Sequence, residues 1–332
     1  MKDLTDSINV AVIGAGYWGK KVICEYLRLA RVNPGANVHM VCDPLDETLV
    51  HCVKSYGIPS KNLTKDYRKV LKSRDVDAIH ICTPNETHYQ ICREALEAGK
   101  HVLLEKPMTL NSKCAYELVD MAESRDLALQ VGYIFRFNNA LNKVRKLIKE
   151  GYFGDIYYLT LQWTTLLQPS PESDIITDLA PHPIDILNYL LDQWPMKVSC
   201  KGGTYRRNRL EEVAYVTTEF DGDRMANIEL SWLQPGKVRQ TSIIASERCV
   251  TVDCLNQIIR VYENKKDRVR DLRVQKNNTI LTEISHFIKH VLWNEKSINS
   301  GPIGARNVEV LECLRRALQE EKTIRLPPVR YR

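Results

Sequence analysis

The first 130 residues alternate between short apolar runs and longer stretches that carry apolar residues at helical spacing. The short runs predict buried parallel strands, because they are too short for helices and have no polar face. They lie at 10–13, 38–41, 76–82, 101–104 and 127–132. The helical spacing predicts helices over 18–27, 45–56, 67–73, 88–98 and 111–124. Strands and helices that alternate in this way predict an α/β fold with a doubly wound parallel sheet.

Beyond about Tyr133 the pattern changes to runs of strands. A helix at 138–149 is followed by a long alternating strand from Ile156 and by a helix near 182–191. Further alternating runs lie at 197–201, 213–220, 225–232, 238–245, 249–253 and 257–263, and a final helix covers 303–320. Asp221-Gly222, between two of these runs, is a strong hairpin signal.

These patterns predict two domains. Residues 1–130 form the domain with the parallel sheet, and residues 131–332 form an α+β domain with a large, mostly antiparallel open sheet. An open sheet with one uncovered face would expose a large apolar patch on a monomer. We therefore expect a homodimer or homotetramer joined through this second sheet.

The first predicted strand runs into three glycines and then a helix, in the sequence INVAVIGAGYWGKK. In a G-x-G-x-x-G turn, Gly14 permits the tight turn, Gly16 lets a pyrophosphate approach the backbone, and Gly19 lets helix pack on strand. The helix N-terminus offers free N–H groups to the phosphates. A glycine turn that only closes a strand–helix unit has the same pattern, so the motif alone leaves both readings open.

A carboxylate after the second strand favours dinucleotide binding. Asp43 stands where an acidic side chain accepts hydrogen bonds from an adenosine ribose, and no arginine follows it directly to neutralise a 2′-phosphate. The sequence therefore predicts NAD, rather than NADP, as the cofactor. Tyr17 and Trp18, between the second and third glycines, belong to the predicted set of cofactor contacts.

Composition and charge argue against several other classes of protein. The 332 residues, 44% of them hydrophobic, suffice for two folded domains, and the net charge of +6 is mild. The basic stretches at 206–209 and 265–273 are typical of solvated hairpin faces, so we expect no nucleic-acid partner. The N-terminus shows no apolar leader, and no run reaches membrane-spanning length, so we expect no membrane association.

The ten cysteines contain no C-x-x-C pair and mostly lie in apolar runs. They predict buried thiols in a reducing compartment and hence a cytoplasmic protein. His286 and His290 are one helical turn apart, but the glutamate of a metalloprotease motif is missing. We interpret them as helix-surface histidines and expect no metal site.

Several stretches together resemble the family of dehydrogenases named after glucose–fructose oxidoreductase, inositol dehydrogenase and MocA (Gfo/Idh/MocA). Besides the glycine turn, they are TPNETH at 83–88, ALEAGKHVLLEKP at 95–107, GYIFRF at 132–137, GDI at 154–156 and DLAPHPID at 178–185. They follow the family's order along nearly the whole chain. The resemblance implies an N-terminal Rossmann domain, a C-terminal α/β domain with an open sheet, and an active site in the cleft between them.

The resemblance also implies roles for single residues. Lys106, Asp178 and His182 stand where the family keeps its catalytic lysine, aspartate and histidine, and the Lys106–Pro107 bond is expected to be cis. The cofactor site would be closed around the nicotinamide half by residues of two of these stretches, namely Thr83, Asn85, His88, Glu105 and Lys106.

The three catalytic candidates suit the oxidation of a secondary alcohol. Histidine is the side chain best suited to take a hydroxyl proton near neutral pH, which makes His182 the base. Lys106 can hydrogen-bond the same oxygen and stabilise developing negative charge. Asp178 could hold the substrate or orient the histidine. Taken singly, Lys106 could be a surface lysine and Asp178 the N-cap of a helix near Pro181 and Pro183.

The predicted substrate is a sugar or a nucleotide-linked amino sugar. The stretches at 178–191 and 231–246 look most like the family branch that oxidises UDP-N-acetylglucosamine or its uronic acid at C3. An inositol or free-sugar dehydrogenase, a keto-sugar reductase and a cofactor-sensing regulator without catalysis are alternatives. Arg136 could grip an anionic substrate group or form a structural salt bridge. Lys106, Asp178 and His182 also count as substrate contacts, and Tyr133, Asn138 and Arg239 are further candidates.

Overall fold

A computed structural model describes residues 7–32, 35–168, 174–206, 210–263 and 268–331. The chain forms two compact units, and both are discontinuous in sequence. The first comprises Met1–Ile134 and Asn278–Ala305, and the second comprises Phe135–Asn277 and Arg306–Arg332. The simple division at residue 130 therefore misplaced the segment 278–305, which returns to the first unit.

The first unit contains a six-stranded sheet in the order β3-β2-β1-β4-β5-β6, and every strand pair is parallel. This order confirms the doubly wound sheet. The strands are β1 Ile8–Ile13, β2 Ala36–Cys42, β3 Leu63–Thr64, β4 Ala78–Ile81, β5 His101–Leu104 and β6 Leu129–Val131. The two-residue β3 was not predicted, because so short a strand carries no recognisable hydrophobic pattern.

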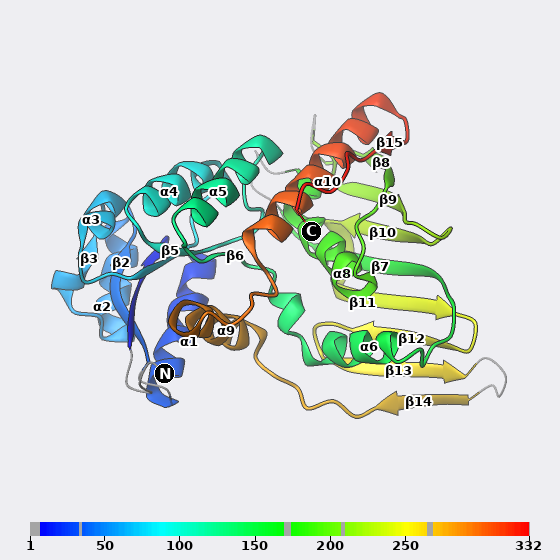
Figure 1. Cartoon of the computed structure of the whole chain (residues 1–332), viewed down its shortest axis with the longest axis horizontal. Coiled ribbons are helices and arrows are strands. Elements are labelled where there is room, and N and C mark those ends of the chain that lie inside the picture. Colours follow the sequence, from blue (N-terminus) through cyan, green and yellow to red (C-terminus); the bar gives the residue numbers. More distant parts are fainter. Residues whose placement is uncertain (1–6, 33–34, 169–173, 207–209, 264–267, 332) are drawn as a thin grey trace. The chain divides into compact units, whose positions relative to one another are not determined.

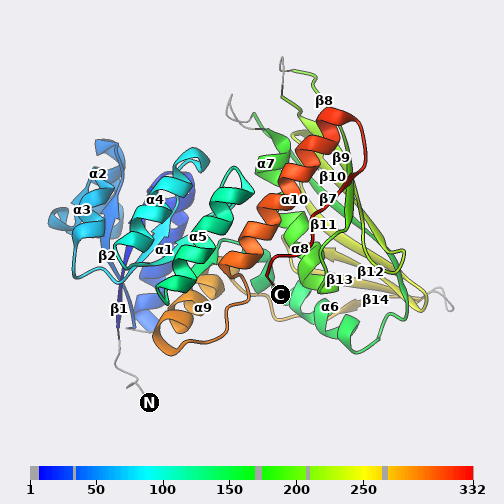
Figure 2. The same cartoon turned by 45° about the horizontal axis from the view of Figure 1, so that its top comes forward.

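Helices cover both faces of this sheet. They are α1 Tyr17–Val32, α2 Asp46–Tyr56, α3 Tyr67–Lys72, α4 Asn85–Glu97, α5 Ser112–Ser124 and α9 Thr279–Trp293, with a 3-10 turn η1 at Ser60–Asn62. α4 and α5 lie side by side (Figures 1 and 2). α4 begins at Asn85, three residues before the predicted start of this helix at His88.

α9 explains why the late segment joins the first unit. Its side chains Ile284, Phe287 and Ile288 are fully buried in the same hydrophobic core as Val22 and Tyr26 of α1. An apolar helix face of this kind must be covered by another element, and here the six-stranded sheet and α1 cover it.

The second unit contains a nine-stranded sheet in the order β14-β13-β12-β11-β7-β10-β9-β8-β15. β7 and β10 pair in parallel, and the other neighbouring strands pair antiparallel. This agrees with the mostly antiparallel sheet that the sequence predicted. The strands are β7 Ile156–Leu166, β8 Lys197–Gly203, β9 Val213–Glu219, β10 Met225–Ser231, β11 Leu233–Ala245, β12 Arg248–Asp253, β13 Ile258–Glu263, β14 Arg268–Leu272 and β15 Ile324–Arg325.

Two predicted hairpin features can be located in this sheet. The Asp221-Gly222 turn joins β9 to β10, and Gly222 has a φ of 74°. The basic stretch at 265–273 contains the exposed edge strand β14, whose arginines keep the edge soluble. Of the basic stretch at 206–209, only Arg206 lies within the described residues.

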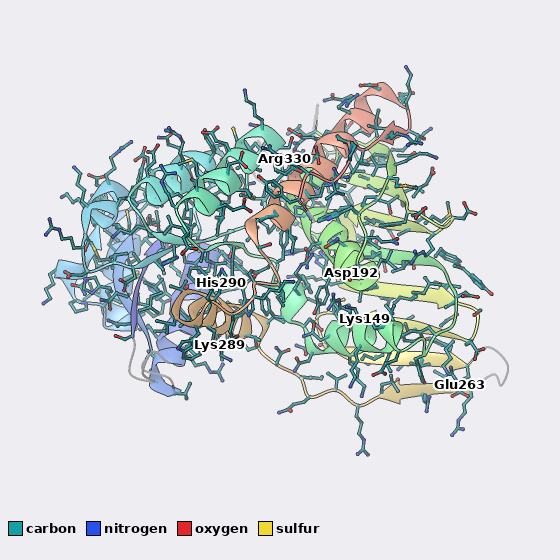
Figure 3. All side chains as sticks on the ribbon, viewed as in Figure 1. Lys149, Asp192, Glu263, Lys289, His290 and Arg330 are labelled. Atoms are coloured by element: carbon teal, nitrogen blue, oxygen red, sulfur yellow. The ribbon has the colours of Figure 1, made fainter. Side chains whose placement is uncertain are left out.

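One face of the nine-stranded sheet is covered by helices (Figure 2). They are α6 Asn139–Lys149, α7 Ile175–Leu179, α8 Pro181–Leu191 and the part of α10 Gly301–Glu320 from Arg306 onward, with a 3-10 turn η2 at Ile134–Phe137. At the exposed ends of α6 and α8, the Lys149 ammonium lies 3.9 Å from an Asp192 oxygen; both residues are labelled in Figure 3.

The other face of this sheet differs from the expectation of a large apolar patch. Alternation along the strands leaves mainly polar side chains there. Gln162 donates to Glu229 at 3.1 Å, and Thr217 donates to Asn227 at 2.9 Å. Exposed Tyr158, Tyr215 and Met225 make the face mixed rather than apolar. The uncovered face is therefore less apolar than the sequence predicted, because strand residues that face away from the helices are here mostly hydrogen-bonding ones.

All ten cysteines are unbridged thiols. Among the described residues, no helix has both the length and the hydropathy needed to cross a membrane.

Candidate active site

The glycine turn between β1 and α1 is shaped by close backbone approaches. Gly14 has a φ of 91°, and a Cβ there would lie 2.6 Å from the Cys82 carbonyl oxygen. A Cβ on Gly19 would lie 1.9 Å from the Gly14 carbonyl oxygen. Gly16, in contrast, has no atom within 4 Å of its Cβ position. Gly14 and Gly19 are thus required by the fold itself, whereas Gly16 faces open space.

Asp43 anchors this turn from the end of β2. Its Oδ2 accepts from the Ala15 N–H at 2.8 Å and its Oδ1 from the Leu45 N–H at 3.0 Å. The side chain is buried, and its remaining lone pairs are acceptor sites for a further donor. The open space at Gly16 and the N–H groups at the start of a 16-residue helix, which have no acceptor within the helix itself, fit the pyrophosphate of a dinucleotide.

The two residues that follow Gly16 differ in their surroundings. Tyr17 is exposed, and its hydroxyl accepts from Lys21 Nζ at 2.8 Å. Trp18 turns inward, and its indole Nε1–H donates to Glu105 Oε1 at 2.5 Å. Contact between either side chain and a cofactor stays a prediction.

His88 joins the loops at the carboxyl edge of the sheet. Its Nδ1 lies 2.9 Å from the Pro107 carbonyl oxygen and its Nε2 lies 2.9 Å from the Thr83 carbonyl oxygen. Burial lowers the pKa of this imidazole, although the two carbonyls act in the opposite direction. His88 therefore ties the start of α4, at Asn85, to the loop that carries Lys106.

The stretch Glu105-Lys106-Pro107 follows β5, and the Lys106–Pro107 bond is cis, as the resemblance implied. Lys106 is half-buried and Glu105 is buried. Besides Trp18, the Glu105 carboxylate meets His80 of β4, with 3.3 Å between Nε2 and Oε1. The sequence reasoning did not single out His80; the available signal was a histidine inside an otherwise apolar buried strand.

In the second unit, Asp178 and His182 come from two nearly continuous helices. α7 ends at Leu179, and Ala180 keeps helical backbone angles before α8 begins at Pro181. Asp178 and His182, four residues apart, therefore lie on one face. Asp174, rather than Asp178, caps α7 by accepting from the Thr177 N–H, and α8 has no side-chain cap. The capping alternative for Asp178 is thus wrong.

Aromatic rings and a buried cation surround these two side chains. Trp232 Nε1 donates to Asp178 Oδ2 at 3.2 Å. The His182 ring packs edge-on against Phe135, with 5.0 Å between centroids, and Phe135 packs in the same way on Trp163 at 5.1 Å. These contacts hold the imidazole in a mainly apolar setting with a carboxylate one turn away.

Arg239 of β11 is the cation. It donates to the Thr164 and Val238 carbonyl oxygens at 2.8 and 2.7 Å and lies over the Trp163 ring. Burial lowers the pKa of this guanidinium to about 10, and nearby Asp178 opposes that effect. Arg239 therefore stays charged at neutral pH beside the Asp178 carboxylate.

The remaining substrate-contact candidates have structural partners. Buried Arg136 donates to Asp185 at 2.7 Å and to Asn188 at 2.6 Å, so it does form the structural salt bridge named as one alternative. Asn138 caps α6 and donates to the Cys254 carbonyl at 2.8 Å. Tyr133 is fully buried in the first unit. Substrate contact by these three residues stays a prediction.

The two histidines of α9 both meet the loop that follows the helix. The Ile298 N–H donates to His286 Nε2 at 3.2 Å, and His290 Nδ1 lies 2.5 Å from the Glu295 carbonyl oxygen.

Comparison with known proteins assigns the family. Residues 8–133 match the family model described as "Oxidoreductase family, NAD-binding Rossmann fold", and residues 141–251 match the model of the GFO/IDH/MocA C-terminal domain. The chain belongs to the Gfo/Idh/MocA family. It is therefore an NAD(P)-dependent dehydrogenase by family, with an NAD(P)-binding Rossmann domain as its first unit.

The relatives to which the chain is similar are named for different substrates. The chain is 29% identical over 241 residues to UDP-N-acetylglucosamine 3-dehydrogenase of Acidithiobacillus ferrooxidans, covering 70% of this chain and 75% of the relative. It is 26% identical over 325 residues to scyllo-inositol 2-dehydrogenase (NAD(+)) of Bacillus subtilis, covering 91% and 92%.

Solved structures share the fold over almost the whole chain. The structure of the Acidithiobacillus ferrooxidans UDP-N-acetylglucosamine 3-dehydrogenase has a TM-score of 0.83 at 24% identity and covers 95% of this chain and 98% of its own. A levoglucosan dehydrogenase in complex with NADH and L-sorbose has a TM-score of 0.87 at 19% identity, with 97% and 100% covered.

Proposed function

We propose that this protein is an NAD-dependent dehydrogenase that oxidises a secondary hydroxyl of a sugar or of a nucleotide-linked amino sugar. The observation that carries the proposal is the pairing of Asp178 and His182 on one helical face, beside Trp232 and Arg239. The dinucleotide-type glycine turn and the Glu105-Lys106 stretch of the first unit support it. Relatives named as dehydrogenases of sugars and inositols support it further.

The residues have distinct proposed tasks. A bound nicotinamide would supply the hydride acceptor. His182 takes the hydroxyl proton as general base, since an imidazole is a competent proton acceptor near neutral pH. Its ring is held by edge-on packing against Phe135. Lys106 donates a hydrogen bond to the same oxygen and stabilises its developing charge. Asp178, fixed by Trp232, orients the imidazole or a substrate hydroxyl.

Asp43 supports NAD over NADP. A 2′-phosphate brought to this buried carboxylate would meet a like charge at a cost of several kcal/mol. Titration should therefore show tighter binding of NAD(H) than of NADP(H). Equal or reversed affinities would contradict the assignment of Asp43.

The proposed substrate class is tested by a panel. Protein and NAD are mixed with UDP-N-acetylglucosamine, its uronic acid, inositols and free sugars, and the appearance of reduced-nicotinamide absorbance is followed. Reduction of keto-sugars by NADH tests the opposite direction. Oxidation of a UDP-sugar alone would support the nucleotide-sugar branch. If NAD binds and no member of the panel reacts in either direction, the regulator alternative replaces the proposal.

We also propose a homodimer or homotetramer that uses the uncovered face of the nine-stranded sheet. The exposed Tyr158, Tyr215 and Met225 among hydrogen-bonding side chains support an interface. Light scattering at micromolar concentration measures the mass. A value near the 38.2 kDa of one chain would refute the proposal.

A further inference from the structure

A polar cluster is buried on one face of the six-stranded sheet, behind the Glu105-Lys106 stretch. The strand register places Val12, His80, Leu103 and Gln130 side by side across β1, β4, β5 and β6. His80 and Gln130 are fully buried polar residues in this row. Such side chains are uncommon at the centre of a parallel sheet, where apolar ones stabilise the fold, so the cluster calls for a physical reason.

Glu105 is the carboxylate of this cluster, and it directly precedes the catalytic candidate Lys106. Three parts of the first unit contact its side chain. Trp18 of α1 donates to Oε1 at 2.5 Å, and His80 of β4 lies 3.3 Å from the same oxygen. Gly132 bounds the other side, since a Cβ there would lie 2.7 Å from Oε2. Three separate elements thus fix this one carboxylate.

The hydrogen-bond roles in the cluster are determined by chemistry. An ionised carboxylate only accepts, so the Nε2 of His80 must carry the proton that it directs at Glu105. A buried carboxylate is stable only with such donors. Among the described residues, His80 supplies the basic nitrogen that lies close to the Glu105 carboxylate, 3.3 Å from Oε1. Tyr26 supports His80 by packing edge-on against its ring at 5.9 Å.

The two donors do not involve the second oxygen. Trp18 and His80 both lie at Oε1, while Oε2 packs against Gly132, whose missing side chain leaves room for this oxygen. The nicotinamide half of a dinucleotide offers ribose hydroxyls and a carboxamide N–H₂, all of which donate hydrogen bonds. An oriented acceptor at the carboxyl edge of the sheet suits them.

We infer that His80 is a positioning residue for cofactor binding: it donates to Glu105 Oε1 and, with Trp18, holds Oε2 toward the nicotinamide half. The inference rests on the proposed function in that Glu105 is taken as a cofactor contact. His80 itself touches neither cofactor nor substrate and acts through Glu105.

A metal ion is the competing account of the same cluster. His80, Cys82 and Glu105 offer three ligand atoms within 4.8 Å of one another. One observation favours hydrogen bonding, because the Trp18 N–H is already directed at Oε1, the same oxygen that His80 faces.

The test compares NAD affinity by calorimetry in matched variants. His80→Leu removes the donor, and we expect the NAD dissociation constant to rise about tenfold or more, the scale of one hydrogen bond to a charged group. His80→Gln restores an N–H donor and should bind within about threefold of the unmodified protein. Tyr26→Phe is the matched control, since it changes a buried neighbour that donates nothing to Glu105 and should leave affinity within about twofold.

A second variant guards against misfolding of His80→Leu. Trp18→Phe removes the other donor to the same oxygen and should weaken NAD binding similarly, and the two changes should be non-additive because both act through Glu105. Thermal melting of each apo variant reports the fold separately. In turnover, KM for NAD should rise more than kcat falls, because catalytic groups are unaltered.

The outcomes separate this inference from the proposed function. If the unmodified protein does not bind NAD, both fail. If Glu105→Gln weakens NAD binding and a folded His80→Leu does not, the inference alone is wrong. Stoichiometric zinc in the purified protein, lost in His80→Leu and in Cys82→Ala, would also overturn it in favour of the metal account.

Discussion

The two units hold their candidate functional residues in different ways. In the first unit, backbone geometry dominates: Gly14 and Gly19 have no room for a side chain, and both ring nitrogens of His88 lie 2.9 Å from backbone carbonyl oxygens. In the second unit, side chains contact side chains. Trp232 binds Asp178, and Phe135 packs against His182.

This difference indicates which part can change and which cannot. In a site built from close backbone approaches, any side chain added at these positions collides with the main chain. Such a site tolerates few substitutions and therefore suits a single type of ligand, such as a dinucleotide. A site built from aromatic and charged side chains can be altered one residue at a time.

The largest expected effect concerns catalysis. Lys106→Ala and His182→Ala should lower turnover by about two to four orders of magnitude, the usual reach of general-base and oxyanion stabilisation. NAD binding should be nearly intact, because the glycine turn is untouched. Lys113→Ala, at an exposed site on α5, and His51→Ala, on α2, are the control variants. Wild-type turnover by Lys106→Ala would show that the catalytic assignment is wrong.

The second effect concerns the stability of the second unit. Arg136→Met should leave the buried Asp185 carboxylate without its cationic partner and reduce the free energy of unfolding by about 3–5 kcal/mol. Burial already raises the pKa of Asp185 to about 6 despite Arg136. Denaturant unfolding measures the loss. The control is Arg260→Met, which breaks the exposed Arg260–Asp271 pair and should cost less than about 1 kcal/mol. Equal losses would show that burial does not increase the contribution of the Arg136–Asp185 pair to stability.

The third prediction contrasts two glycines of one motif. Gly19→Ala should destabilise the first unit by about 3 kcal/mol, because the new methyl group meets the Gly14 carbonyl. Gly16→Ala should change stability by less than about 0.5 kcal/mol and yet weaken NAD binding, since its methyl group enters the space left for the pyrophosphate. Denaturant unfolding and NAD titration of both variants distinguish the roles. Strong destabilisation by Gly16→Ala would contradict this division.

The smallest effect is pH-dependent and belongs to the second unit. Burial alone would raise the pKa of Glu212, but hydrogen bonds from the N–H groups of Arg206 and Tyr205 lower it to about 2. A depressed folded-state pKa stabilises the protein above the ordinary value of 4.5, and this stabilisation is lost as pH falls from there toward 2.

Glu212→Gln should therefore cost about 2 kcal/mol at neutral pH, and the difference from the unmodified protein should shrink below pH 4.5. Denaturant unfolding over this pH range provides the measurement. A difference that is constant with pH would show that the carboxylate charge contributes nothing.

Local patterns in the sequence were enough for much of the fold and for part of the candidate site. The apolar runs predicted the parallel strands, and the period-two alternation predicted most of the second sheet, because both patterns follow from burial of neighbouring residues. The four-residue spacing of Asp178 and His182 suffices to put them on one helical face. The spacing of the three glycines likewise predicts the turn between β1 and α1.

Other features depended on residues that are far apart in the chain, and only the tertiary structure decided them. α9 returns to the first unit because its apolar face meets the core around α1. Arg136 contacts Asp185, and His80 contacts Glu105, because separate elements pack together, and no local sequence pattern predicts these contacts. The uncovered sheet face carries many polar side chains, and cross-strand neighbours such as Gln162 and Glu229 hydrogen-bond to one another there. The strength of these contacts depends on distance and burial, which arise only when separate elements pack together.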